Sequence, residues 1–394
     1  MSDANIIRAA LFTPGPRGLW GLPFRLVGEP GTAKSDIMVQ VAANAGLHVK
    51  VLIASLREPA DFLGLPVVRG DGTVGNAPPD WVSEVLEHPH SAVFFDEINT
   101  CPPAVQAVLL RIVLDRVVGE VRLPSTVRMI AAQNGVDDSA GGYDVSSSLA
   151  NRFGTLCDWR APDAEAWSAW LVGEGGFGAE PVGTVDPVAL QERVLERWHA
   201  DYAWAAGHVS TFVQRKPSIL HAKPEAGSPQ ASLAWPSRRT WAMATRALAA
   251  SRAHGLTEEE TDRYVGAFVG QAAVVELRSF IQNCDLPHPA DFLDGLVEFR
   301  HDDSRMDRTM AVLASCSALV VPRDADRRVE RAAVLWSFIR QVMAKAADVA
   351  FPTVKVLCKK GVGLERDGEV FNEDASAVLT RFQPMLAAAG LMRG

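Results

Sequence analysis

The sequence has few cysteines, no long apolar run and no excess of positive charge. Its five cysteines are odd in number, lie far apart and form no CxxC pair: Cys101, Cys157, Cys284, Cys316 and Cys358. This pattern argues against a disulfide framework or a zinc site and favours reduced thiols. No apolar run approaches the ~18 residues of a membrane-spanning helix, so we expect no membrane insertion.

The charge balance and the first residues narrow the class of protein further. The 394 residues carry a net charge of −8, which makes a nucleic-acid-binding surface over the whole molecule improbable. The first twelve residues, MSDANIIRAALF, lack the basic segment and long apolar segment of a signal peptide. We therefore expect a cytoplasmic protein, with length for about two or three domains of ~150 residues.

The first 160 residues alternate short apolar runs with amphipathic stretches. Apolar runs without polar alternation are typical of strands buried on both faces of a parallel sheet. Helices are predicted at Ser35–Ala45 and Ala104–Asp115, and the alternation predicts an α/β domain with crossover helices. The predicted strands are Phe24–Val27, Val49–Ala54, Ala92–Phe95, Val127–Ala132 and Gly154–Cys157.

After residue 160 the sequence predicts helices. Residues 216–232 are rich in proline, serine and lysine and indicate a linker, and Thr257 with Glu260 forms a capping box that opens a helix to about Gln282. Helical periodicity continues over 304–320 and 326–347. We predict an α/β domain over 1–160, a connecting segment over 161–232 and an all-α lid over 233–394. Seven tryptophans fall close together and indicate a helical core, or else a peptide- or base-stacking surface: Trp159, Trp167, Trp170, Trp198, Trp204, Trp235 and Trp241.

The stretch GEPGTAKS lies between a predicted strand and a predicted helix, as a phosphate-binding loop does. The pattern G-x-x-x-x-G-K-[ST] asks for glycine at the position of Ala33. In such a loop the backbone N–H groups bind phosphate, Lys34 reaches the β- and γ-phosphates, and Ser35 ligates Mg²⁺. The alternative is an ordinary glycine-rich turn. The candidate nucleotide-binding residues are Gly28, Glu29, Pro30, Gly31, Thr32, Ala33, Lys34 and Ser35.

An apolar strand that ends in Asp96 and Glu97 supports the nucleotide interpretation. The carboxyl ends of parallel strands form the ligand-binding edge of an open α/β sheet. There Asp96 is predicted to hold Mg²⁺ through its water shell, and Glu97 to deprotonate the water that attacks the γ-phosphate. Taken alone, the two acids could simply end a strand.

Two later positions complete the set of candidate catalytic residues. Asn134 ends another buried strand and is predicted to bond the attacking water or the γ-phosphate. Arg152 lies just before the last strand. From this position it could project into the nucleotide site of a neighbouring subunit. A surface salt bridge is the competing interpretation for Arg152.

The motifs GEPGTAKS, VFFDEI, AAQN and LANRF, in this order, resemble those of the AAA+ ATPases and, among them, the MoxR family. That family commonly shows alanine before the lysine, as at Ala33. The segment PSRRTW resembles its lid signature, which implies that Arg239, or else Arg238, contacts the γ-phosphate. Arg128 is a rival to Arg152 for the intersubunit role.

The resemblance also implies cofactors, partners and a task. It implies binding and hydrolysis of ATP with Mg²⁺. It also implies a homo-oligomeric ring, expected to be a hexamer, and a chaperone-like remodelling motor that works with a von Willebrand factor A domain protein. Hairpins predicted around Gly70–Gly72 and over Val117–Pro124 could contact the client or be inert. The alternatives are an ATP-dependent binding switch and a magnesium-chelatase-like or nucleic-acid-linked subunit.

Overall fold

The computed structural model describes residues 2–135, 143–159, 161–172, 185–322, 325, 327–362 and 373–391. Contacts divide the chain into two compact units. The first consists of Met1–Glu196 and Ser218–Val275, and the second of Arg197–Pro217 and Glu276–Gly394. The boundaries predicted at residues 160 and 232 are not the division between these units, and they stay predictions.

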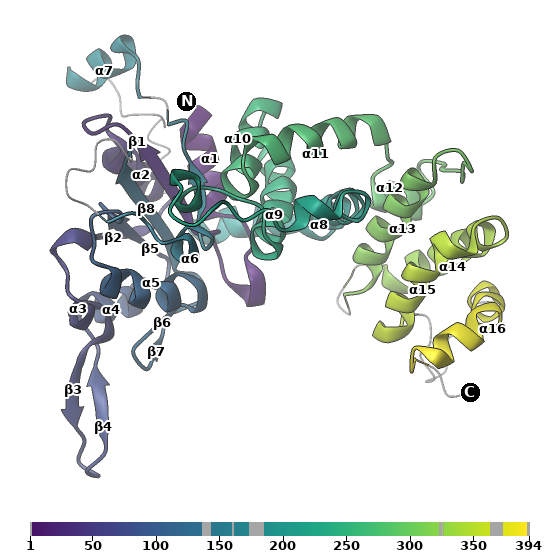
Figure 1. Cartoon of the computed structure of the whole chain (residues 1–394), viewed down its shortest axis with the longest axis horizontal. Coiled ribbons are helices and arrows are strands. Elements are labelled where there is room, and N and C mark those ends of the chain that lie inside the picture. The colour runs from purple at the N-terminus through teal and green to yellow at the C-terminus, as the bar shows by residue number, and fades with distance from the viewer. Residues whose placement is uncertain are drawn as a thin grey trace. The chain divides into compact units, whose positions relative to one another are not determined.

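A five-stranded sheet in the order β2-β5-β8-β1-β9 forms the centre of the first unit (Figure 1). Every pair of neighbouring strands is parallel. The predicted parallel α/β fold is therefore confirmed, and the five predicted strands are present with ends shifted by one or two residues. Their bounds are β1 Phe24–Gly28, β2 His48–Ile53, β5 Ser91–Asp96, β8 Arg128–Asn134 and β9 Gly154–Leu156.

The register of the strands separates two edges of this sheet. Gly28 at the end of β1 pairs with Asn134 at the end of β8, and β5 ends at Asp96. The start of β9, Gly154, pairs with Phe24 at the start of β1. Residues that follow β1, β5 and β8 thus lie at the carboxyl edge, whereas residues just before β9 lie at the amino edge.

Helices cover both faces of the sheet. On one face, a core cluster joins Phe95 and Met129 of the strands to Leu109 of α5 (Pro103–Asp115) and Trp81 of α4 (Asp80–Glu87). On the other, α2 (Lys34–Asn44) contacts β2, β5 and β8, and α1 (Ser2–Leu11) contacts α2. The shorter helices of this region are η1 Pro16–Gly18, η2 Ala54–Leu56, α3 Pro59–Leu63 and α6 Ser147–Ala150.

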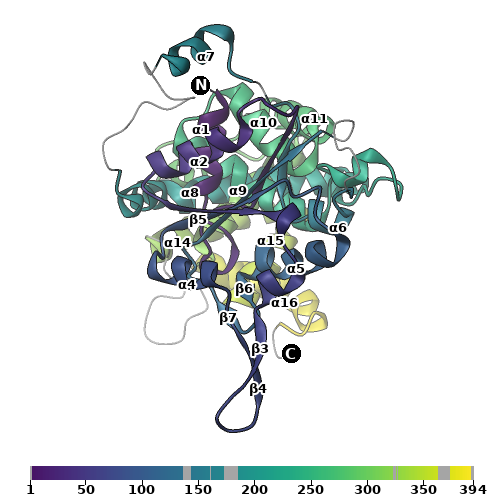
Figure 2. The same cartoon turned by 90° about the vertical axis from the view of Figure 1, so that its left-hand side faces the viewer.

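Two antiparallel hairpins occupy the positions predicted from the sequence. The first consists of β3 (Leu65–Val68) and β4 (Val74–Ala77), and the second of β6 (Val117–Val118) and β7 (Val121–Arg122). The β3–β4 hairpin projects from the first unit, with β6–β7 near its base (Figure 2). An ion pair between Arg69 and Glu120 joins the two hairpins.

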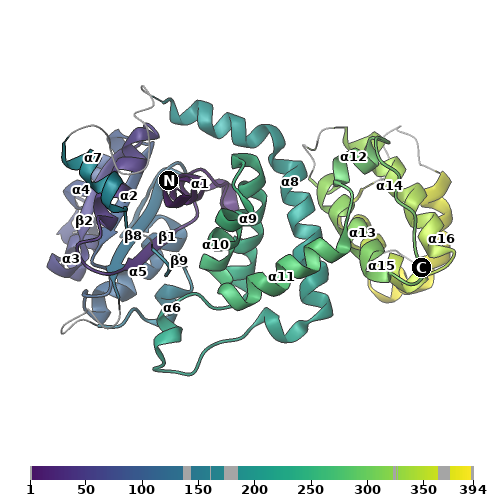
Figure 3. The same cartoon turned by 90° about the horizontal axis from the view of Figure 1, so that it is seen from above.

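The helices after the sheet begin largely where the sequence predicts them. The capping box of Thr257 and Glu260 is confirmed at the start of α10 (Glu258–Val269), which packs beside α9 (Arg238–His254) (Figure 3). The prediction of one helix to about Gln282 was wrong. Gly270 has φ 81° and ends α10, and α11 (Gln271–Cys284) follows. The other elements here are α7 Ala164–Leu171, α8 Pro187–Arg215, η4 Pro217–Leu220 and η5 Pro229–Ser232.

A buried arginine joins the sheet to the segment that enters α9. Arg25, in β1, donates hydrogen bonds to Gln133 Oε1 in β8 (2.6 Å), Thr155 Oγ1 in β9 (2.8 Å) and the Ser232 carbonyl in η5 (2.6 Å). Burial lowers the pKa of Arg25 to about 10, so the side chain is still a cation at neutral pH. A buried cation is tolerated only when it is hydrogen-bonded, and here acceptors from three segments bond its two terminal nitrogens, Nη1 and Nη2.

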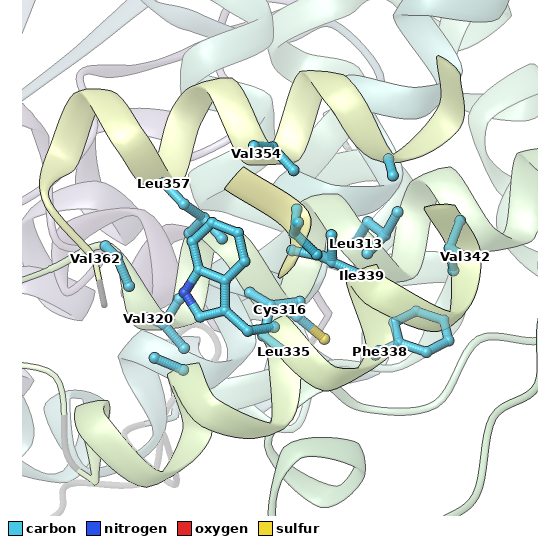
Figure 4. Close-up of a cluster of buried hydrophobic side chains, with 14 of the residues drawn as sticks. Leu313, Cys316, Val320, Leu335, Phe338, Ile339, Val342, Val354, Leu357 and Val362 are labelled. Carbon is cyan, nitrogen blue, oxygen red and sulfur yellow. The ribbon is translucent and has the colours of Figure 1, made fainter. Parts of the chain in front are cut away.

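The second unit is helical and has its own core. One buried cluster contains Leu313 and Cys316 of α13 (Met306–Val320), Leu335 and Ile339 of α14 (Arg328–Met343) and Leu357 of α15 (Ala347–Lys360) (Figure 4). No helix among the described residues has both the length and the apolar character needed to cross a membrane. The remaining helices of this unit are α12 Pro289–Leu293 and α16 Glu373–Ala388.

The close approach of α8 to α13 leads to a stability prediction. A Cβ added to Gly207 would lie 1.7 Å from Ser315 Oγ and 2.8 Å from the Ser315 backbone nitrogen. Gly207→Ala should therefore destabilise the second unit by about 1–3 kcal/mol through overpacking, although alanine is the better helix former. Urea unfolding followed by circular dichroism measures the change. Adding Ser315→Gly should recover part of the loss, and a single Gly207→Ala variant as stable as wild type would contradict this packing.

Candidate functional site

The phosphate-loop sequence forms the turn between β1 and α2. Gly31 has φ 75°, and Ala33, the residue before the helix, has φ 61° and ψ 24°, which is the left-handed conformation. A residue with a Cβ takes this conformation at a cost of roughly 1–2 kcal/mol. Ala33 thus adopts the backbone shape that the usual glycine would adopt without strain.

Lys34 lies inside the loop rather than in solvent. Its Nζ donates to the carbonyl oxygens of Gly28 (3.0 Å) and Glu29 (2.5 Å) and to Asn134 Oδ1 (3.3 Å). The lysine is buried. The ammonium group thus lies at the ends of β1 and β8, where a phosphate bound by the loop would need a positive charge.

Ser35 and Asp96 meet at the same edge. Ser35 Oγ donates to Asp96 Oδ2 over 2.8 Å. A hydroxyl and a carboxylate that lie side by side are hard oxygen donors of the kind that Mg²⁺ takes, together with waters and phosphate oxygens. These two residues therefore fit the predicted magnesium site.

Glu97 follows β5 in a strained conformation and has a hydrogen-bond partner that the sequence did not indicate. It has φ 52°, and its N–H donates to Asp96 Oδ1 over 2.9 Å. Ser55 Oγ in η2 donates to Glu97 Oε2 over 2.8 Å. The exposed carboxylate is thus held from the end of the neighbouring strand β2, directly before the segment that carries the β3–β4 hairpin.

Asn134 lies between the loop and the acidic pair. Its side-chain oxygen accepts from Lys34, and its carbonyl accepts from Asn99 Nδ2 over 3.5 Å. The structure therefore brings the predicted residues Lys34, Ser35, Asp96 and Asn134 together at one edge, with Glu97 next to them in sequence.

Arg152 and Arg239 lie together at the other edge of the sheet. Arg152 precedes β9 and donates to the Ser148 carbonyl (2.7 Å), while Arg239 donates to Asn151 Oδ1 (3.4 Å). Burial, and then the charge of Arg239, lower the pKa of Arg152. β1 separates the edges by about 13 Å, four residue-to-residue steps of ~3.3 Å each. Arg239 therefore lies at the edge opposite the loop of its own chain, and its contact with γ-phosphate stays a prediction.

The rival arginine, Arg128, is buried. Its Nε donates to the Leu11 carbonyl (3.2 Å), and its guanidinium lies 4.9 Å from the centre of the Phe12 ring. Burial lowers the pKa of Arg128 to about 9. The side chain joins α1 to the start of β8 and cannot extend to another subunit without leaving the core.

Trp159 is a further site residue that the sequence did not identify, because it was grouped with tryptophans of a helical core. Its indole Nε1 donates to the Thr32 carbonyl over 3.2 Å. A Cβ on Gly28 would lie 3.0 Å from the indole Cδ1. The indole therefore packs against the loop. Of the other clustered tryptophans, Trp198, Trp235 and Trp241 are buried, whereas Trp167 and Trp170 are exposed.

The fold and the phosphate loop together define the class of protein. A parallel sheet with a strand–loop–helix phosphate loop and acids at its carboxyl edge is a P-loop nucleotide-binding domain. Residues 23–153 match the family described as AAA domain (dynein-related subfamily). The match covers about a third of the chain, includes the loop, Asp96, Glu97, Asn134 and Arg152, and assigns this part of the chain to the AAA class.

Among solved structures, the chain is similar to a protein from Cytophaga hutchinsonii described as a "putative ATPase", with 16% identity and a TM-score of 0.42. The similarity covers 71% of this chain and 87% of that one. No curated protein matches the sequence.

The positions of Arg128 and Arg152 lead to different predictions for the free energy of unfolding. Arg128→Ala should lower the free energy of unfolding by about 2–4 kcal/mol, because it empties a buried site and leaves the Leu11 carbonyl unpaired. Arg152→Ala should change that free energy by less than about 1 kcal/mol, because the side chain is partly exposed. Thermal unfolding of both variants measures the difference. Equal loss of stability in the two variants would contradict the assignment of Arg128 to the core.

Proposed function

We propose that the protein is an ATPase of the AAA+ class that binds ATP with Mg²⁺ at Gly28–Ser35. The observation that carries the proposal is the pair of contacts Ser35–Asp96 and Lys34–Asn134, at 2.8 and 3.3 Å. These contacts join the loop to the ends of β5 and β8. A glycine-rich turn without a nucleotide role would not need an ammonium, a hydroxyl, a carboxylate and an amide at one point.

In the proposed reaction, each group of the carboxyl edge has one task. Lys34 and the loop N–H groups bind the phosphates, and Asn134 orients the attacking water. Glu97 accepts the proton of that water as it attacks the γ-phosphorus and the bond to the bridging oxygen of ADP breaks. Mg²⁺ at Ser35 and Asp96 would neutralise charge on the β- and γ-phosphates. Ser55 bonds only Oε2 of Glu97, so the other carboxylate oxygen can accept the proton of the attacking water.

Arg152 and Arg239 act on the nucleotide of a neighbouring subunit in this proposal. Both lie at the edge opposite the loop, and the Nε of Arg152 has no hydrogen-bond partner among the described residues. A cation brought to the γ-phosphate from another subunit stabilises the charge of the transition state. The active form is then a closed ring, in which each chain contributes a loop on one side and arginines on the other. A hexamer is the ring size that we propose.

The work driven by hydrolysis is proposed to be remodelling of a protein client, as in the MoxR family, in the cytoplasm and with a von Willebrand factor A domain protein as partner. The β3–β4 hairpin supports a protein client. It exposes Val68 by 76% and Val74 by 65%, an apolar surface that water disfavours and a protein segment could cover. The hairpin also continues from α3 and η2, which contains the Ser55 that holds Glu97.

Two substitutions test binding and hydrolysis separately. Lys34→Ala should raise the Kd for ATP by at least tenfold, because the loop loses its buried ammonium. Glu97→Gln should keep the affinity and lower kcat by about 10²–10⁴, the usual size of general-base catalysis. Isothermal titration and phosphate release measure the two effects, with Glu87→Gln, an exposed acid of α4, as the matched control. Normal turnover by Glu97→Gln would remove Glu97 from the mechanism.

Mixing of variants tests the intersubunit arginine. Arg152→Ala and Glu97→Gln should each be inactive alone, and their mixture should regain a fraction of the activity, since some interfaces then pair an intact Glu97 with an intact Arg152. A mixture of Lys34→Ala with Glu97→Gln should stay inactive, because both changes damage the site of their own chain. If the first mixture also stays inactive although mixed oligomers form, Arg152 does not act between subunits.

A further inference from the structure

The Thr32–Ala33 peptide is the point of the phosphate loop at which this chain departs from the usual pattern. Ala33 takes a left-handed conformation, with φ 61°, that glycine would take without strain. A group outside Thr32 and Ala33 is therefore needed to hold this turn in its left-handed conformation. The side chain that contacts it is Trp159, which follows β9 and lies 127 positions away in the sequence.

The indole of Trp159 holds one carbonyl of this turn. Its Nε1 donates to the Thr32 carbonyl over 3.2 Å. The peptide that follows Thr32 is planar and trans, as are the peptide bonds of the other described residues, so its N–H points opposite to its C=O. Holding the Thr32 carbonyl therefore also fixes the direction of the Ala33 N–H, one of the groups that bind phosphate in such a loop.

Two other carbonyls of the loop have partners in the loop or in α2. The Glu29 carbonyl accepts from Thr32 Oγ1 (2.7 Å) and from Lys34, and the Ala33 carbonyl accepts from the Ile37 N–H (3.1 Å) as α2 begins. The bond to the Thr32 carbonyl, in contrast, comes from outside β1, the loop and α2. Trp159 is thus an external support of the left-handed turn.

The position of Trp159 is itself fixed from two sides. Its ring lies against Gly28, where a Cβ would come within 3.0–3.3 Å of the indole. Its neighbour Asp158 accepts from Arg263 Nε of α10 (2.7 Å), and the Asp158 carbonyl accepts from Arg263 Nη2 (2.9 Å). A donor held in this way can keep the loop in shape without being ordered by the ligand.

We propose that Trp159 is a positioning residue for phosphate binding, and that its indole N–H keeps the Thr32–Ala33 peptide in the left-handed turn that a glycine would otherwise supply. The proposal rests on the nucleotide binding proposed above. It predicts that substitutions at residues 33 and 159 have non-additive effects on the affinity for nucleotide, although only the side chain of Trp159 donates a hydrogen bond to the turn.

A double-mutant cycle with Mg²⁺ and ADP as the probe tests the proposal by isothermal titration. Trp159→Phe keeps a ring against Gly28 but removes the donor, so the Kd for ADP should rise about fivefold, the effect of one hydrogen bond. Ala33→Gly should restore most of the lost affinity in Trp159→Phe, and the gain in affinity that it gives should be several times larger in that background than in the wild-type background. Trp167→Phe, at an exposed tryptophan of α7, is the matched control and should bind like wild type.

A second readout separates positioning from a general effect on folding. Trp159→Phe and Trp167→Phe should both keep the wild-type circular dichroism spectrum, so that a loss of affinity confined to Trp159→Phe is not a loss of folded protein. If Trp159→Phe does not fold, benzothienylalanine at position 159 retains the shape of the indole, replaces its N–H with sulfur and should give the same fivefold loss.

The outcomes are distinct. If the donor-free variants bind ADP with wild-type affinity, or if Ala33→Gly has the same effect in both backgrounds, the role of Trp159 is overturned. The proposed function is then still supported, provided that the wild-type protein binds ADP. If the wild-type protein does not bind ADP, both the proposed function and this inference are overturned.

Discussion

The buried guanidinium of Arg25 is the interaction on which the arrangement of the first unit depends. From the middle of β1 it bonds to β8, to β9 and to the Ser232 carbonyl of η5. β1 leads into the phosphate loop, β8 ends at Asn134, β9 leads to Trp159, and η5 precedes the helix that carries Arg239. Since an unpaired cation in this position would be strongly unfavourable, the four segments can move apart only at a large cost in free energy.

Parallel pairing then divides the chemistry between two edges. The register places the loop, the acids and Asn134 at the carboxyl ends of β1, β5 and β8, whereas Arg152 and Arg239 lie where β9 begins. Under the proposed function, these two groups of residues would form the two parts of a phosphoryl-transfer site, with the arginines at the edge opposite the loop of their own chain. Asn151 contributes to this separation, because its side-chain oxygen accepts from Ser237 as well as Arg239 and so holds the start of α9 against α6.

The sequence predicted the features that depend on neighbouring residues. The strands, both hairpins and the capping box at Thr257 follow from local periodicity, turn residues and spacing. The break at Gly270 was missed, because helical periodicity continues through a glycine whose left-handed φ ends the helix. The contacts of Ser55 with Glu97 and of Trp159 with Thr32 were missed for another reason. They join residues 42 and 127 positions apart, and no periodicity or motif within either segment indicates the other. The burial of Arg128 likewise depends on α1, far away in the sequence.

Two residues with a Cβ, Ala33 and Glu97, adopt left-handed backbone conformations on the two segments that meet at Ser35 and Asp96. Such strain persists only where the surroundings over-determine the backbone. At position 97 the proposed general base would require an acid in spite of this strain, and the Asp96 carboxylate offsets part of the strain by accepting the N–H of Glu97. At position 33 the alanine side chain has no role that requires the left-handed conformation. Divergence among related loops should therefore be correlated: lineages that lose the indole after the last strand should regain glycine before the lysine, and alanine should persist where an external donor persists.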